Sequence, residues 1–145
     1  MLESFQLIIS LLDSTIRIAT PLIFCAMAGI FSERSGIIDI GLEGKMLLSA
    51  FVAATATFLT GSPILGLFAA ILASCSASLI HGFACITHKG DQVISGLAIN
   101  ILASGLTITL GIALFSRGGQ TPPLASEQRF MPIEFPFLDQ ASHVP

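Results

Sequence analysis

The sequence predicts an all-α, polytopic membrane bundle of about four transmembrane helices, with one broken or re-entrant segment. Of its 145 residues, 53% are hydrophobic and only 10% are charged, and the mean hydropathy is +0.88. Soluble domains carry about 25% charged residues, so this composition is that of an integral membrane protein. The net charge of −3 is small and diffuse, and it does not point to a nucleic-acid partner.

The first membrane helix is expected at residues 14–32, which carry one charged side chain at Arg17 before the run ends. Asp13 and Arg17 stand four apart with the acid first, the favourable order for an ion pair on a helix. Pro21 is expected to bend this helix. The residues before this helix carry an acidic side chain near their start, Glu3, and no basic region, so a cleaved signal peptide is not expected.

Residues 31–46 concentrate five charged side chains and three glycines between two uncharged runs. They could form a solvated loop or a broken membrane segment. The uncharged run 46–60 has 15 residues, and at about 1.5 Å per residue it is shorter than the roughly 30 Å hydrocarbon core. We therefore expect a helix over 40–60, which draws Glu43 and Lys45 to membrane depth.

Irregular backbone at that depth must be buried in protein or line a watery cavity. We expect residues 37–45 to pack inside the bundle, with a charge pair that offsets the cost of burial. The acid is Asp39 or Glu43, and the base is Lys45 or Arg34.

A third helix is expected over 63–87, beginning with Pro63 and carrying no charge before His88. Small residues recur in it every four positions, a spacing that lets membrane helices approach closely. The positions predicted to pack against neighbouring helices are Gly66, Ala70, Ser74, Ser78 and Gly82.

A fourth helix is expected over 93–116, and its most polar residue, Asn100, should face protein or a water-filled path. Residues 1–116 then form the transmembrane region. Residues 117–145 hold five of the seven prolines and are expected to form an extramembrane loop or tail.

Cys25, Cys75 and Cys85 lie in apolar segments, so we expect small buried residues and no disulfides. His81 and Cys85 stand four apart, but a third metal ligand is not evident. No cofactor is expected, and the sequence has no Gly-x-x-x-x-Gly-Lys-Ser/Thr phosphate loop, so ATP would have to bind to another chain.

Three sequence blocks carry a family resemblance: residues 19–22 with 31–44, residues 91–100, and residues 118–124. They resemble the N-terminal half of permease subunits of bacterial ABC importers, in the branch for nucleosides and simple sugars. The resemblance implies a multi-pass inner-membrane protein with a separate ATP-binding subunit, a second permease chain and an extracytoplasmic substrate-binding protein. It also makes Asp39, Glu43 and Asn100 candidates for the substrate path.

Two departures from the family pattern are charged: asparagine is more usual at Asp39, and an uncharged residue at Lys45. Such permeases are also about twice as long as this chain. A truncated or split permease without independent transport is therefore an alternative, which detection of a second half encoded downstream would test. A membrane-embedded enzyme using Asp39, Glu43 or His81 for acid–base chemistry is the less favoured alternative.

Overall fold

The computed structural model describes residues 2–118 and 120–130, and every regular element in these ranges is a helix. The elements are α1 (Leu2–Arg34), α2 (Leu42–Thr60), α3 (Pro63–Gly82), the π-helix η1 (Phe83–Thr87), α4 (Gln92–Phe115) and the 3₁₀-helix η2 (Ser126–Gln128). Four spans, with α3 and η1 counted as one, are long and apolar enough to cross a membrane. The predicted all-helical membrane bundle is confirmed.

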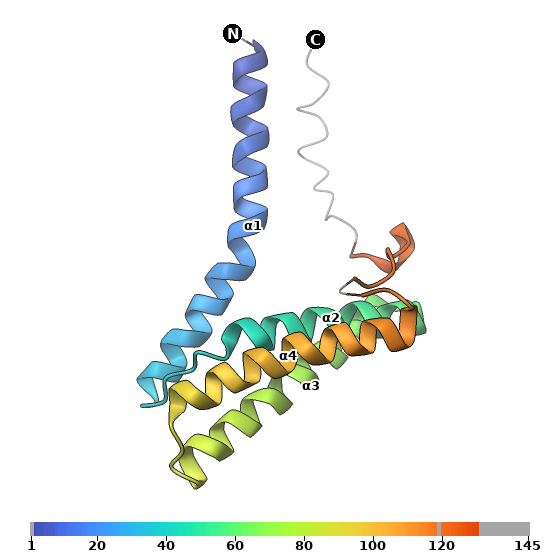
Figure 1. Ribbon diagram of the computed structural model, residues 1–145. Coiled ribbons are helices and arrows are strands. Elements are labelled where there is room, and N and C mark those ends of the chain that lie inside the picture. The colour runs from blue at the N-terminus through green and yellow to red at the C-terminus, as the bar shows by residue number, and fades with distance from the viewer. Residues whose placement is uncertain (1, 119, 131–145) are drawn as a thin grey trace.

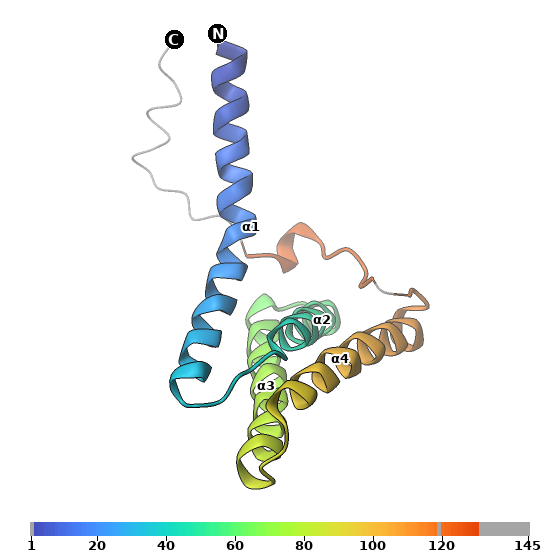
Figure 2. The ribbon, with the colours of Figure 1, turned by 60° about the vertical axis from the view of Figure 1, so that its left-hand side comes forward.

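Helix α2 is the centre of the bundle, because it packs along both α3 and α4, whereas α3 and α4 contact each other much less (Figures 1 and 2). The approach of α2 to α3 is close at Gly66, where an added Cβ would meet Thr57 Oγ1 and lie 2.8 Å from the carbonyl oxygen of Ala53. Gly66 and Thr57 are both buried.

The buried face of α3 differs from the predicted every-fourth-residue stripe. Gly66 is buried and Ala70 and Ser74 are half-buried, but Ser78 is exposed and Gly82 only half-buried. The reason is geometric: at about 100° per residue, Ser78 is rotated by about 120° from Gly66, whereas Ala77, eleven residues on, returns to nearly the same face. The buried line continues instead through Ala77, His81 and Cys85.

Helix α1 begins at Leu2, well before the predicted start at residue 14. Asp13 and Arg17 are helix-compatible residues, so charge at these positions does not end the helix. Helix α1 contains Pro21 and changes direction partway along its length (Figure 1). Its main contact is with α2, and no residue in its most apolar stretch is buried.

The other helix ends lie within two residues of the predicted ones. Helix α2 begins at Leu42, because Gly41 is its N-cap and the Asp39 carboxylate accepts a hydrogen bond from the Gly41 amide. Helix α4 begins at Gln92, and the carboxylate of its N-cap, Asp91, accepts hydrogen bonds from the amides of Val93 and Ile94. It ends at Phe115, before the left-handed Ser116.

The described part of the predicted tail turns back toward the bundle after α4 (Figure 1). Leu124, Gln128 and Phe130 share a hollow of about 340 Å³ with residues of α2 and α3, among them Ala50 and Thr57. Residues 131–145 of the predicted tail lie outside the described residues.

Candidate functional site

Residues 35–41, between α1 and α2, form no regular helix and are held against α4 by side chains of that helix. The Ile38 amide donates to Gln92 Oε1 at 2.7 Å. Asn100 binds at two points: its Nδ2 donates to the Ile40 carbonyl at 3.1 Å, and its Oδ1 accepts from the Gly44 amide at 2.7 Å. The protein itself therefore satisfies backbone groups that a helix would have paired internally.

Two glycine contacts bring this segment close to α4. A Cβ on Gly44 would lie 2.7 Å from Asn100 Cα, and a Cβ on Gly96 would lie 2.9 Å from the Gly41 amide nitrogen. A larger residue at either position would push α2 and α4 apart, so the Asn100 hydrogen bonds depend on both glycines.

Asp39 is the centre of a buried polar cluster. Its Oδ2 is paired with the Lys45 ammonium group, and the two side chains are 9% and 4% exposed. Its Oδ1 accepts from the Gly41 amide at 3.0 Å and lies 3.8 Å from His81 Nε2. His81 Nδ1 is 3.0 Å from Ser95 Oγ. The cluster thus joins the irregular segment to α2, α3 and α4.

The structure does not bring every predicted pairing residue into an ion pair. Glu43, Arg34, Asp13 and Arg17 are all exposed, and among residues 2–118 and 120–130 the ion pairs involve only Asp39 with Lys45 and His81. The predicted Asp13–Arg17 pair is absent. Exposed pairs are worth only about 0–1 kcal/mol, which does not fix two long side chains in one geometry.

A groove runs between α2 and α4, and we call it the α2–α4 groove. It consists of two hollows that share Leu47. The first, of about 480 Å³, is lined by Glu43, Gly44, Leu47, Asn100, Ile101, Ser104 and Gly105. The second, of about 350 Å³, is lined by Leu47, Ala50, Phe51, Thr107, Gln120 and Thr121. Both volumes fall in the range of about 300–1,000 Å³ typical of small-molecule sites.

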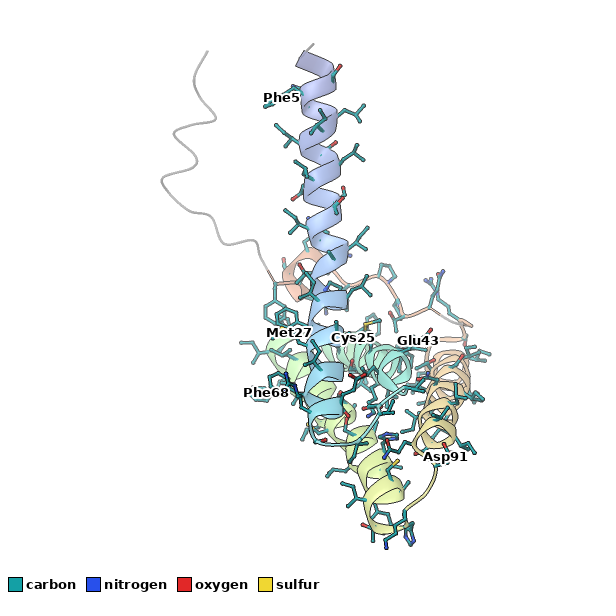
Figure 3. All side chains as sticks on the ribbon, turned by 90° about the vertical axis from the view of Figure 1, so that its left-hand side faces the viewer. Phe5, Cys25, Met27, Glu43, Phe68 and Asp91 are labelled. Carbon is teal, nitrogen blue, oxygen red and sulfur yellow. The ribbon has the colours of Figure 1, made fainter. Side chains whose placement is uncertain are left out.

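Glu43 lies between the ribbons of α2 and α4, whereas Phe5 projects from the far end of α1, away from the bundle (Figure 3). The carboxylate is exposed and has no hydrogen bond or ion pair within the described chain. It is therefore free to accept hydrogen bonds from a molecule in the first hollow. An acidic residue in the first turn of α2 is also favoured by the helix dipole.

Cys85 Sγ lies 3.8 Å from His81 Nε2, both residues being buried. Within the part of the chain that the structure describes, no three His, Cys, Asp or Glu side chains are grouped so that they could hold a metal ion. Cys25 and Cys75 are free thiols.

Sequence reasoning missed several residues of this region: Gln92 and Ser95 at the start of α4, and Phe51 and Gln120 in the groove. Gln92 and Ser95 could have been found, since polar side chains in the first turns of an apolar helix need partners. Gln120 could not, because its place depends on how the chain turns back after α4.

A chain with four membrane-length helices and a buried charge cluster between them is a multi-pass membrane protein. Its residues 11–139 match the family described as branched-chain amino acid transport system / permease component, and the chain belongs to this family.

Three relatives have curated names. The chain is 41% identical over 113 residues to the guanosine ABC transporter permease protein NupQ of Bacillus subtilis, covering 74% of this chain and 35% of the relative. It is 37% identical over 101 residues to the putative glucose ABC transporter permease protein TsgC13 of Haloferax volcanii, covering 70% and 31%. It is 33% identical over 108 residues to the nucleoside ABC transporter permease protein NupC of Lactococcus lactis, covering 70% and 34%.

The chain therefore spans about a third of the length of these relatives. No solved structure matches it closely enough for comparison.

Proposed function

We propose that this chain forms part of the membrane permease of an ATP-driven importer of nucleosides, with simple sugars as the second substrate class. The relatives named for guanosine, nucleoside and glucose transport support this proposal. The permease would act in a bacterial cytoplasmic membrane with a separate ATP-binding subunit, a second permease chain and an extracytoplasmic substrate-binding protein.

The observation that carries the proposal is the Glu43 carboxylate in the α2–α4 groove, which has no hydrogen-bond or ion-pair partner among the described residues. Nucleosides and sugars are uncharged and rich in hydroxyl groups, and a carboxylate accepts hydrogen bonds from such hydroxyl groups. The Ser104 hydroxyl lines the same hollow and can both donate and accept.

Asp39 and Asn100 have a different role in this proposal. Their polar atoms are already bonded to Lys45, Gly41, Gly44 and Ile40, so they act on the path by holding the irregular segment and the start of α2 in place. Glu43 then contacts the substrate from a fixed backbone, as positioning of binding groups requires.

The test is ATP-dependent uptake of radiolabelled guanosine and ribose into proteoliposomes that hold the complete transporter containing this chain, supplied with its binding protein. We expect uptake in the parent and a fall of about tenfold or more in Glu43→Gln, since hydrogen bonds to charged groups are worth about 1.5–3 kcal/mol. The matched control is Glu33→Gln, an exposed residue of α1. Absence of uptake in a correctly assembled parent would refute the proposed function and favour a permease remnant.

A further inference from the structure

The second hollow of the α2–α4 groove differs from the first in its chemistry. Its lining residues include Phe51, Gln120, Thr107 and Thr121, which carry an aromatic ring, an amide and two hydroxyls. The first hollow has a carboxylate and a hydroxyl but no aromatic ring.

We infer that the two hollows take the two halves of a nucleoside, with the planar base against Phe51 and Gln120 and the ribose against Glu43 and Ser104. This inference rests on the proposed function and names its preferred substrate class.

Base recognition commonly combines stacking on an aromatic face with hydrogen bonds to the base edge. Phe51 offers the face. Gln120 can donate and accept at once through its amide, which matches an edge that carries adjacent donors and acceptors. Thr107 uses its hydroxyl proton on the Ser104 carbonyl at 3.1 Å, which leaves its oxygen as an acceptor.

The spacing of the two subsites agrees with one bound molecule. Glu43 and Phe51 are eight residues apart on α2, which is about 12 Å along the helix axis at 1.5 Å per residue. Leu47 lies between them and lines both hollows, so the hollows are adjacent.

The experiment measures binding of tritiated guanosine to the detergent-purified complete transporter without its binding protein, with guanine and ribose as competitors. Loss of base stacking in Phe51→Leu should weaken guanosine binding about tenfold and abolish displacement by guanine, while ribose still competes. Glu43→Gln should abolish displacement by ribose, while guanine still competes. Phe51→Tyr, which keeps the aromatic face, should bind guanosine like the parent, and the ribose competition retained in Phe51→Leu would show that this variant is folded.

Phe58→Leu is the matched control, because Phe58 is on the same helix but contacts Phe115 outside the groove, with ring centroids 5.5 Å apart. It should leave all three measurements unchanged. Equal loss of guanine and ribose competition in Phe51→Leu would overturn the inference. So would unchanged guanosine binding in that variant, the result expected if lipid fills the second hollow. Either result could occur with normal uptake in the parent, so the proposed function would stand.

Discussion

Lys45, in the first turns of α2, is paired with Asp39, six residues earlier in the irregular segment, and both side chains are buried. The two charged departures from the pattern of the resembled family, Asp39 and Lys45, thus contact each other. Each charge compensates the other, so neither is an isolated charge at membrane depth.

The pair predicts a strong coupling between the two positions. Asp39→Asn or Lys45→Met alone should destabilise the protein by about 3–5 kcal/mol, because each leaves one buried charge without its partner. The double variant should recover most of this loss, since replacing both charges is often neutral. The measurement is the melting temperature of the parent, the two single variants and the double variant, which together form a double-mutant cycle. If the two single losses simply add in the double variant, the side chains do not interact directly.

The hydrogen bonds of Asn100 should slow hydrogen exchange in the backbone at the start of α2. Asn100→Ala removes the partners of the Gly44 amide and the Ile40 carbonyl. Gly44 is buried, so leaving its amide unpaired should cost about 1–3 kcal/mol, whereas Ile40 is exposed and its carbonyl can bind water. Hydrogen exchange at Gly44 should become faster in this variant. Thr109→Ala is the control, since that hydroxyl binds only its own helix, at Gly105. Equal exchange rates at Gly44 in both variants would show that the hydrogen bond from the Gly44 amide to Asn100 does not stabilise this segment.

Gly44 should be intolerant of even one added carbon. Gly44→Ala places a Cβ 2.7 Å from Asn100 Cα and should lower stability by about 1–3 kcal/mol through overpacking. At Gly82 the nearest atom, Ile86 Cδ1, would be 3.9 Å away, so Gly82→Ala should be neutral or stabilising. If thermal unfolding ranks the two variants in the opposite order, α2 and α4 do not approach as described.

The connection at Lys89 and the segment containing Ser126 should face opposite sides of the membrane. Lys89 follows α3 and η1, and Ser126 lies beyond α4, which crosses back. Single cysteines at the two positions, in a background without the three native ones, should be labelled by an impermeant maleimide from opposite sides. Labelling of both positions from the same side would show that α4 does not cross the membrane.

The membrane helices could be predicted because hydropathy is local. Runs without charge indicated the spans, and the short run after Lys45 indicated that charge would be drawn into the bundle. The predicted start of α1 is twelve residues late, because charge at Asp13 and Arg17 indicates a membrane interface but does not end a helix. The buried face of α3 differs from the prediction at Ser78, which is rotated by about 120° from Gly66 at about 100° per residue.

The choice of partner for Lys45 could have been narrowed further. Glu43 and Lys45 are two apart on a helix and cannot face each other, which leaves Asp39 as the nearer acid. The contacts of Asp39 with His81, and of Gln120 with the groove, depend on how distant segments fold together. No local pattern in the chain encodes them.

The π-helix η1 has a consequence for insertions and deletions in this chain. A π-turn holds one residue more than an α-turn, so it behaves as a single-residue insertion accommodated without breaking the helix. Deleting one residue from 83–87 would let this turn return to α geometry, and because the π-turn takes up its extra residue within one turn, the chain after it would keep its direction relative to α3. Residues 88–91 form no regular helix, so α4 would keep its place beside His81. The change would stay local to the contact between the Phe83 and His88 rings, whose centroids are 4.8 Å apart. This turn is therefore a place where the chain can change its length by one residue without repositioning α4.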